Sequence, residues 1–393
     1  MISVEKAIQI VSNNSNPITK SKGINLSSAL GYVLFEDVVA PINMPPFRQS
    51  AMDGYALNLH DIKEYSIVGE VKAGDDYNPT LKTGEAVRIF TGAPVPDSAN
   101  AVVMQEKTEV EGSRLQLMSS VNKNDNIRPL GEQVLKGAIA LNKGTKLFSA
   151  GIAYLTSLGI TKVKVYKKPS IAIVVTGNEL AESGENLQYG QIYESNAIML
   201  SITLKQLGYD KVSIHKVEDN YDSTFKLLNV VINQHDVVLV SGGISVGDYD
   251  FVGKALNELD VEELFYKVNQ KPGKPLFFGK KEDKIIFALP GNPAAALSCF
   301  YMYVLLAIEK IIGNNNFSLH KTKATSTSDF IKKGERAQFL KAIYHEGVVE
   351  ILEGQNSSML HTFALANAMV YLSETATSIN KEDKIEVILL PIN

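Results

Sequence analysis

Uninterrupted apolar runs separated by helical segments fill residues 169–312 and constrain the fold more than any other feature. The run SIAIVVTG at 170–177 shows no polar alternation, as expected of a parallel strand that is buried on both faces. Two similar runs, DVVLVSG at 236–242 and IIFALPG at 285–291, follow after helical segments. Strands that alternate with helices form a parallel sheet covered by helices on both faces. The sequence therefore predicts a doubly wound α/β domain.

Helical and strand-like segments complete this domain. The pattern predicts further strands at 211–217 and 261–268, and helices at 196–207, 222–234, 249–259 and from Pro293 onward. The last helix is apolar over a length that could cross a membrane, but Glu309 and Lys310 interrupt its end. Because the flanking pattern is that of a soluble α/β domain, we favour a buried helix.

The chain outside this domain changes pattern several times. Up to about residue 40 the period is helical, residues 43–128 read as short strands with Gly and Pro between them, and residues 129–168 mix helix and strand. A linker at 313–318 leads to short strands over 319–393. We therefore expect a helical N-terminal region, a β-rich unit and a small C-terminal β domain.

Composition and charge exclude several classes of function. The 393 residues have a net charge of -4, which offers no general attraction for nucleic acid, so an anionic ligand must be bound by local groups. The single cysteine, Cys299, excludes an intramolecular disulfide, a zinc ribbon and an iron–sulfur site, and fits a reducing compartment. The N-terminus is amphipathic and lacks the apolar core of a signal peptide.

The loop after the third predicted strand is the strongest candidate for ligand binding. Its sequence, SGGISVGDYD, contains two serines, three glycines and two aspartates, namely Ser241, Ser245, Gly242, Gly243, Gly247, Asp248 and Asp250. Glycines expose backbone N–H groups, which suit an anion, whereas aspartates repel one. A magnesium ion that bridges carboxylates to phosphate-type oxygens satisfies both. The loop therefore predicts an oxyanionic ligand together with a divalent metal.

Four other polar loops follow strands of the same predicted domain. They contain Thr176-Gly177-Asn178-Glu179, Glu218-Asp219-Asn220, Lys271 with Lys274, and Pro290-Gly291-Asn292-Pro293. Taken singly, each is explained at least as well as a turn, a helix N-cap, a solvated surface or a helix start. Ligands of open α/β sheets bind at the carboxyl ends of the strands, where we expect these loops to meet. No Gly-Lys-Ser/Thr follows the glycines, so the predicted site is not a Walker-type loop.

A second unusual stretch lies in the β-rich unit at residues 44–57. The sequence MPPFRQSAMDGYAL enters through an extended Pro-Pro pair and concentrates polar residues just before Gly54, among them Asp53. A similar Gly/Pro turn, FTGAPVP at 90–96, exposes Thr91. A plain loop with a turn at Asp53-Gly54 is an equal alternative to a functional role for this stretch.

Eight motifs together resemble one known family. They are PPFRQSAMDGYA, TGAPVP, IRPLGE, TGNEL, GQIYESN, SGGISVGDYD, KPGKP and LPGNPAA, and they occur in the order expected of the MoeA family. These proteins are molybdopterin molybdotransferases and are related to the carboxy-terminal part of gephyrin. The resemblance covers essentially the whole chain.

The resemblance implies the final step of molybdenum cofactor synthesis. The family converts adenylylated molybdopterin and molybdate into molybdenum cofactor and AMP, with Mg²⁺, and is cytoplasmic and homodimeric in bacteria. The pterin dithiolene supplies the sulfur ligands of molybdenum, so Cys299 is expected to be structural. The implied partners are a MogA-type adenylyltransferase and apo-molybdoenzymes, with no nucleic acid and no membrane.

The resemblance also implies four domains. Residues 1–42 and 129–168 are expected to form a discontinuous N-terminal domain, and 43–128 a β domain inserted in it. Residues 169–312 are expected to form a MogA-like molybdopterin-binding α/β domain, followed by a barrel-like β domain at 319–393. In the family, a cleft forms between the α/β domain of one subunit and the AMDGYA region of the other.

Carried over residue by residue, the resemblance assigns a candidate site. The implied catalytic residues are Asp53, Thr91, Glu179, Asp219 and Asp250. Glu179, Asp219 and Asp250 are also the implied magnesium ligands. The expected substrate-binding residues are Thr176, Gly177, Ser241, Gly242, Gly243, Ser245, Gly247, Lys271, Lys274, Pro290, Asn292 and Pro293. Ser357, in EGQNSSML, is similar to the family's C-terminal Gly-x-x-Ser segment.

Two positions depart from the family pattern. Gln133 stands where the family usually has Asp, and the family usually carries an Arg near the position of Lys341, so these two contacts are not carried over. One alternative, a MogA-type adenylyltransferase, is much shorter and lacks AMDGYA and the C-terminal β domain. The other, a scaffold like the gephyrin relative, lacks support because the chain has no long disordered linker or second fused module. The pattern leaves molybdate and tungstate open as the metal source.

Overall fold

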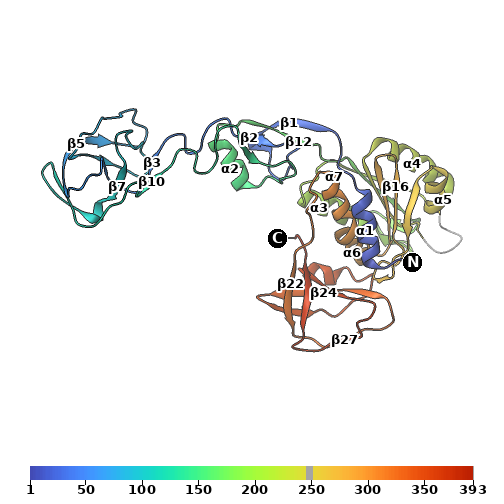
Figure 1. Cartoon of the computed structure of the whole chain (residues 1–393). Coiled ribbons are helices and arrows are strands. Elements are labelled where there is room, and N and C mark those ends of the chain that lie inside the picture. Colours follow the sequence, from blue (N-terminus) through green and yellow to red (C-terminus); the bar gives the residue numbers. More distant parts are fainter. Residues whose placement is uncertain (245–250, 393) are drawn as a thin grey trace. The chain divides into compact units, whose positions relative to one another are not determined.

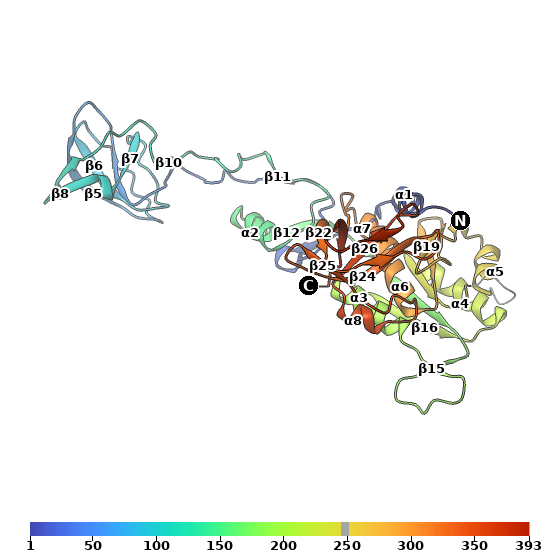
Figure 2. The same ribbon diagram turned by 90° about the horizontal axis from the view of Figure 1, so that it is seen from below.

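The structure is a computed structural model that describes residues 1–244 and 251–392. The chain divides into two compact units, which Figures 1 and 2 show from two sides. The larger unit comprises Met1–Lys22, Gly31–Phe35 and Val165–Asn393, and the smaller unit comprises Gly23–Leu30 and Glu36–Lys164.

A six-stranded sheet forms the centre of the larger unit. Its strands, in spatial order, are β16 (Val212–Val217), β13 (Ile171–Thr176), β17 (Val237–Ser241), β21 (Lys284–Leu289), β20 (Phe277–Lys281) and β18 (Glu262–Tyr266). The first four strands are parallel, whereas β20 pairs antiparallel with both of its neighbours. The predicted doubly wound sheet is confirmed, and β20 is an addition that the sequence pattern did not predict.

Helices cover both faces of this sheet because its strands are apolar on both faces. On β13, Ile173 and Val175 belong to one buried cluster and Ala172 and Val174 to another, as the alternation of side chains along a strand requires. Helices α4 (Tyr221–Gln234) and α5 (Phe251–Glu258) pack on the second cluster. The opposite face carries α1 (Val4–Asn14), α3 (Asn196–Gln206), α6 (Pro293–Cys299) and α7 (Leu305–Ile311), as Figure 1 shows.

The helix that begins at Pro293 runs to Ile311 through a five-residue π turn, Phe300–Val304. It is long and apolar enough to cross a membrane, but 89% of its most apolar window is buried inside the protein. This matches the expected buried helix. Pro293 occupies the first turn, where its missing N–H has no cost.

The N-terminal region corrects one prediction. The helical pattern expected to about residue 40 ends at Asn14, the last residue of α1. A run of Asn and Ser leads to Pro17, which cannot continue a helix. The chain then forms β1 (Ser21–Asn25), the 3₁₀ turn Leu26–Ser28 and β2 (Val38–Val39) instead.

A closed five-stranded barrel ends the larger unit. Its strands, in order, are β24 (Ala337–His345), β25 (Val348–Ile351), β22 (Lys321–Ser326), β28 (Lys384–Leu389) and β26 (Ala368–Leu372), and β26 pairs with β24 to close the ring. The short strand β19 (Gln270–Lys271), from the α/β segment, pairs in parallel with β24. The barrel confirms the expected C-terminal β domain and also carries α8 (His361–Leu365) and the pair β23 (Phe330–Ile331) and β27 (Ser378–Ile379).

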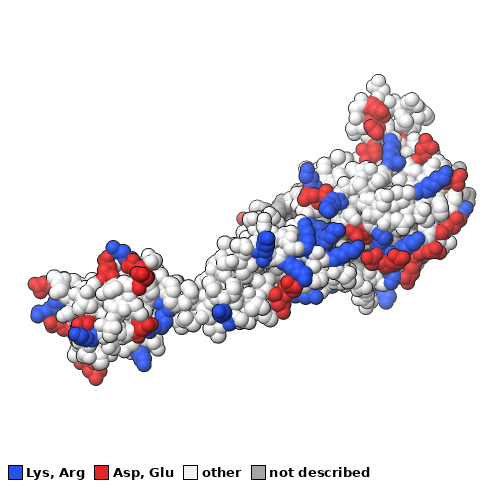
Figure 3. All heavy atoms as spheres, turned by 90° about the horizontal axis from the view of Figure 1, so that it is seen from above, with Lys and Arg blue, Asp and Glu red and all other residues white. Residues whose placement is uncertain are grey.

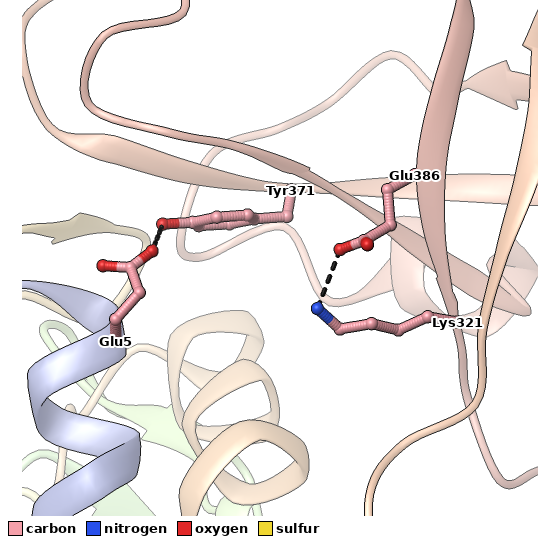
Figure 4. Close-up of polar contacts among 4 residues, drawn as sticks. All are labelled: Glu5, Lys321, Tyr371 and Glu386. Carbon is pink, nitrogen blue, oxygen red and sulfur yellow. Dashed lines mark hydrogen bonds and ion pairs between the residues drawn. The ribbon is translucent and has the colours of Figure 1, made fainter.

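A hydrogen bond joins α1 to the barrel. The hydroxyl of Tyr371 on β26 donates to Oε1 of Glu5 on α1 at 2.6 Å, and beside it Lys321 pairs with Glu386 at 2.8 Å (Figure 4). The Tyr371 hydroxyl holds the pKa of the Glu5 carboxyl below its usual value. The N-terminal helix therefore contacts the barrel within the larger unit.

The smaller unit is built on another six-stranded sheet. Its strands are β7 (Ala101–Met104), β4 (Gly54–Leu57), β6 (Glu85–Ile89), β5 (Glu64–Val71), β9 (Arg114–Leu117) and β8 (Thr108–Glu111). The chain before and after this sheet contains the pairs β3 (Gln49–Ser50) with β10 (Ile127–Arg128) and β2 with β11 (Ile139–Leu141). Helix α2 (Ser149–Ser157) and strand β12 (Lys162–Tyr166) follow. The β-rich pattern of the sequence is confirmed.

Candidate functional site

A cavity of about 510 Å³ opens at the carboxyl ends of β13 and β17 in the larger unit. It is lined by Val175, Thr176, Glu179, Leu180, Ile192, Tyr193, Glu194, Ser195, Asn196, Ser241, Gly242, Gly291, Asn292, Pro293 and Ser358. Six of these residues belong to the site expected from the sequence: Thr176, Glu179, Ser241, Gly242, Asn292 and Pro293. The structure thus brings three of the predicted loops into one cavity.

The loop after β16 joins this wall through a hydrogen bond. The buried Thr176 hydroxyl donates to Oδ1 of Asp219 at 2.8 Å, and the Asp219 backbone N–H donates to Oδ1 of Asn178 at 3.0 Å. Strands β13 and β16 are neighbours in the sheet, so their carboxyl ends bring these loops together. Asp219 is therefore held beside the segment that carries Glu179.

Two glycines after β17 are required by close packing. A Cβ on Gly242 would lie 2.5 Å from the carbonyl oxygen of Thr176, and the φ of Gly242 is 91°. A Cβ on Gly243 would lie 2.6 Å from Thr176 Cγ2 and 2.7 Å from Val252 Cγ2. The backbone here runs directly against the end of β13, which only glycine permits. The other predicted residues of this loop, Ser245, Gly247 and Asp250, lie outside the described residues.

Asn196 is a residue of the cavity that the sequence analysis did not assign. Its amide NH₂ donates to Oγ of Ser241 at 2.8 Å and to the carbonyl oxygen of Gly291 at 2.7 Å, so it ties two loops together. Its Oδ1 atom is buried, and within the described part of the chain it has no hydrogen-bond partner. This oxygen suits an N–H donor of a ligand. The sequence placed Asn196 at the end of the motif GQIYESN and at a predicted helix start, where a polar residue usually caps the helix.

The start of α6 contacts a loop of the barrel. The amide NH₂ of Asn292 donates to Oγ of Ser357 at 2.9 Å, and the backbone N–H of Ala295 donates to the Ser357 carbonyl at 3.3 Å. The next residue, Ser358, lines the cavity. The segment to which the family resemblance assigned Ser357 therefore forms part of the cavity wall.

Lys341 holds that barrel loop from inside. The side chain is only 2% exposed, and its Nζ donates to the carbonyl oxygens of Gly354, Met359 and Asn356 at 2.8, 3.1 and 3.3 Å. Burial lowers the pKa of Lys341 to about 8. The family usually carries an Arg near this position. In this chain the Lys341 ammonium group there is hydrogen-bonded to backbone carbonyl oxygens of the same chain.

The two lysines of KPGKP lie outside the main cavity wall. Both are half-buried, and Lys271 lines a separate cavity of about 170 Å³ with residues of the barrel segment. The backbone between them packs on α6, because a Cβ on Gly273 would lie 2.5 Å from Cys299 Sγ. We call residues 271–274 the lysine loop. The structure connects it to the site through α6 and does not place it among the residues that line the larger cavity.

Among the described residues, no cluster of three or more His, Cys, Asp or Glu side chains could hold a metal ion. Of the three implied magnesium ligands, Glu179 and Asp219 are described and Asp250 lies in the segment that is not. Carboxylate oxygens together with ligand oxygens suit Mg²⁺, which rarely takes a complete set of protein ligands. The magnesium site therefore stays a prediction. The carboxylates of Glu179 and Asp219 are chemically suited to it.

In the smaller unit, the structure joins Asp53 to Thr91. Oδ1 of Asp53 accepts hydrogen bonds from the backbone N–H of Thr91 at 2.7 Å and from its hydroxyl at 2.8 Å, and both residues are exposed. The backbone N–H, and then the hydroxyl, hold the pKa of the Asp53 carboxyl below its usual value. A Cβ on Gly54 would lie 1.8 Å from the Val103 carbonyl oxygen, so only glycine can follow Asp53 at the start of β4.

Arg88 is a second residue that the sequence analysis missed. Its guanidinium lies 5.0 Å from the ring centroid of Tyr55 and 5.2 Å from that of Phe90, and it donates to the side chain of Gln105. Its positive charge also contributes to the lowered pKa of Asp53. A cation in the short strand EAVRI was the only signal, and strands that face solvent carry many such residues.

The chain matches three family models in order. Residues 2–159 match the model described as MoeA N-terminal region (domain I and II), residues 172–310 match a probable molybdopterin binding domain, and residues 323–390 match the MoeA C-terminal region (domain IV). The matched segments contain the smaller unit's sheet, the α/β sheet and the barrel. The chain is thus a multidomain protein in which a probable molybdopterin-binding domain occupies the middle of the sequence.

Full-length relatives agree with these matches. A Staphylococcus epidermidis protein named molybdopterin molybdenumtransferase is 33% identical over 100% of this chain and 96% of its own length. A Haemophilus influenzae protein of the same name is 34% identical over 94% of both chains. The crystal structure of the molybdopterin biosynthesis moeA protein from Pyrococcus horikoshii OT3 superposes with a TM-score of 0.86 at 29% identity, covering 99% of this chain and 100% of that one. This chain therefore belongs to the MoeA family.

Proposed function

We propose that this protein is a molybdopterin molybdenumtransferase, which inserts molybdenum from molybdate into adenylylated molybdopterin and releases AMP. The observation that carries the proposal is the cavity at the carboxyl ends of β13 and β17, in a chain whose full-length relatives bear that name. The loops at this edge carry glycines, hydroxyls and carboxylates in this chain.

The cavity suits a ligand that is part heterocycle and part oxyanion. Ser241 and the backbone at Gly242 offer hydrogen-bond donors to phosphate-type oxygens. The buried Oδ1 of Asn196 offers an acceptor to a ring N–H. Val175, Leu180 and Ile192 supply apolar side chains that a ring system can contact.

The carboxylates Glu179, Asp219 and Asp250 would hold a magnesium ion in this proposal. When bound, the ion polarises phosphoryl oxygens and offsets the repulsion between two anionic substrates. Thr176 orients Asp219 through its hydroxyl, and Asn178 orients the backbone at the same residue. Lys271 and Lys274 lie outside the wall of this cavity. In this proposal, as the family resemblance implies, they stabilise the negative charge that develops as the phosphoanhydride breaks.

The exposed Asp53–Thr91 pair acts, in this proposal, in a homodimer. Its carboxylate is already oriented by two hydrogen bonds and stays ionised, so it is preorganised for a ligand or cation without being buried. The family resemblance implies that this region meets the α/β domain of a second subunit. We infer a cytoplasmic homodimer that receives adenylylated molybdopterin from a MogA-type adenylyltransferase and passes the cofactor to apo-molybdoenzymes.

One assay separates this function from the alternatives. Purified protein is incubated with adenylylated molybdopterin and MgCl₂, with and without molybdate, and AMP is quantified by chromatography. Molybdate-dependent AMP release supports the proposal, and its absence in a folded protein contradicts it. Formation of adenylylated molybdopterin from ATP and molybdopterin would instead indicate an adenylyltransferase, whereas neither reaction would leave a scaffold role.

A further inference from the structure

Gln270 is a buried amide directly beneath the lysine loop. The residue is 0% exposed, and its Nε2 donates to the carbonyl oxygens of Pro272 at 3.1 Å and Gly273 at 3.2 Å. Both carbonyls lie in the backbone between Lys271 and Lys274. The Gln270 side chain therefore fixes this backbone from the interior of the protein.

The other end of the same amide is held by a helix. Its Oε1 accepts a hydrogen bond from the hydroxyl of Tyr303, which is also 0% exposed and belongs to the π turn between α6 and α7. Burial raises the pKa of Tyr303 well above its usual value, so the hydroxyl keeps its proton and donates. One extra residue in a helical turn rotates the residues after it by about 100°. The π turn thus contributes to the direction in which Tyr303 points.

The surroundings leave the lysine loop little freedom. A Cβ on Gly273 would lie 2.5 Å from Cys299 Sγ and 2.9 Å from Gln270 Nε2, and the φ of Gly273 is 88°. Arg336 donates from its guanidinium to the Gln270 carbonyl at 3.2 Å. Burial raises the pKa of the Cys299 thiol to about 12, so Cys299 acts here as a neutral packing group. The loop is thus packed against α6 on one side and attached to the barrel on the other.

A buried amide is costly unless its donors and acceptor are satisfied, and an apolar side chain would fill the same volume without that cost. In Gln270 both ends of the amide are hydrogen-bonded, one to the lysine loop and one to the helix. We propose that Gln270 is a positioning residue, held by Tyr303, that sets the separation and direction of the two lysines toward an anionic substrate. This inference rests on the proposed function for the identity of that substrate.

Two variants test the inference, and a third provides a matched control. Gln270→Met keeps the volume and removes both hydrogen bonds to the lysine loop, whereas Tyr303→Phe removes only the hydroxyl that holds the amide. Tyr209→Phe removes a comparable hydroxyl elsewhere in the same core, where Tyr209 is 2% exposed and donates to Glu309 at 2.9 Å. Melting temperature, kcat and the KM for molybdate are measured for each.

We expect Gln270→Met and Tyr303→Phe to raise the KM for molybdate by about tenfold, because small displacements of binding groups weaken binding strongly. Tyr209→Phe should lower the melting temperature as Tyr303→Phe does, with an unchanged KM. A rise in KM for Tyr209→Phe equal to that for Tyr303→Phe would show a general effect of core stability and would overturn the inference. If Gln270→Met does not fold, Tyr303→Phe decides.

A second measurement is independent of the activity. Brief acetylation with an N-hydroxysuccinimide ester, followed by peptide mass spectrometry, reports the reactivity of each lysine. Lys271 and Lys274 should change in reactivity in Gln270→Met and Tyr303→Phe, while Lys205 on the surface should not. Unchanged reactivity together with unchanged KM in the folded variants rejects the inference. If the wild-type protein releases no AMP, the proposed function fails and the labelling alone decides the role of Gln270.

Discussion

The carboxylates at the cavity edge of the larger unit and in the Asp53–Thr91 pair of the smaller unit differ in how they are attached to the fold. At the cavity, Thr176 is buried, Asp219 is hydrogen-bonded to it, and glycines pack against the same strand end. In the smaller unit, Asp53 and Thr91 bond mainly to each other and face solvent. A carboxylate that is hydrogen-bonded to a buried residue, such as Asp219, is coupled to the stability of the fold. An exposed carboxylate, such as Asp53, can be replaced without destabilising the fold.

The difference teaches how to separate chemistry from folding in this protein. Under the proposed function, changes at the cavity should affect ligand binding and stability together, so activity data there need a stability control. Changes at Asp53 should affect activity alone, because a fully exposed side chain contributes little to the folded state. The following predictions test this contrast.

The largest expected effect is on turnover. Asp219→Asn, Asp250→Asn and Asp53→Asn should each lower kcat by about 100-fold or more, the scale of losing one oriented electrostatic group. AMP release is measured for each protein together with its melting temperature. Full activity in any folded variant would remove that residue from the proposed site, and a lowered melting temperature for Asp53→Asn alone would break the contrast drawn above.

Mixing two inactive variants sharpens the comparison. If Asp53 serves the cavity of a partner subunit, random re-association of Asp53→Asn with Asp250→Asn gives heterodimers with one intact site, and about a quarter of wild-type activity should return. Subunit exchange is verified by native mass spectrometry with one isotope-labelled variant. No recovery despite proven exchange would show that both residues act within one chain or that the protein works as a monomer.

Lys341 should couple the cavity wall to pH. Lys341→Met leaves three carbonyl oxygens without their donor and should lower the free energy of unfolding by about 1–3 kcal/mol. The folded pKa of about 8 lies below the value of 10.5 in the unfolded chain, so the charged form is penalised on folding. This penalty is present below pH 8 and disappears as the pH rises toward 10.5, so wild type should gain stability over the variant in that window. Denaturant melts measure the free energy of unfolding of both proteins across this pH window. A constant difference between wild type and Lys341→Met would contradict the burial of the charge.

A matched pair of threonines gives a smaller effect. Thr176→Val removes a buried hydroxyl that donates to Asp219 at 2.8 Å, and Thr91→Val removes an exposed one that donates to Asp53 at the same distance. We expect Thr176→Val to cost about 1 kcal/mol of stability and Thr91→Val to cost almost none. Thermal melts compare the two directly. Equal losses would mean that the exposed pair also supports the fold.

Gln133, where the family usually has Asp, should have the smallest effect. Its side chain is exposed, and Gln keeps an acceptor oxygen while losing the charge. Gln133→Asp should therefore change the Mg²⁺ dependence of AMP release by less than about tenfold. A much larger gain in metal affinity would place a metal ligand in the smaller unit.

The sequence predicted the fold best where the pattern was purely apolar. Strands β13, β17 and β21 were found because a strand buried on both faces has no polar residues to confuse its period. Strand β20 was missed because Gly279 and two lysines interrupt its short run. The end of α1 was predicted wrongly, because the helical pattern does not continue through the Asn-rich stretch before Pro17.

The site was predictable in its loops but not in its supports. Thr176, Glu179 and Asp219 follow strands, so the carboxyl-edge rule was enough to group them. The roles of Lys341 and Gln270 depend on backbone carbonyls, which every residue carries and no sequence pattern marks. In the sequence, Asn196 looks like an ordinary first residue of a helix. Arg88 looks like an ordinary charged residue of a strand. Their roles become visible only when their neighbours in space are known.

The pairing of β19 with β24 has a consequence for how the protein is made. The lysine loop lies in the middle of the chain, yet the strand to which it attaches belongs to a barrel that is complete only after β28 (Lys384–Leu389) has been made. On the ribosome, the α/β sheet can form while the barrel is still being synthesised. The lysines acquire their final surroundings only when this late segment folds. If the lysine loop binds oxyanions as proposed, a nascent chain with a finished sheet would bind them poorly until the barrel closes.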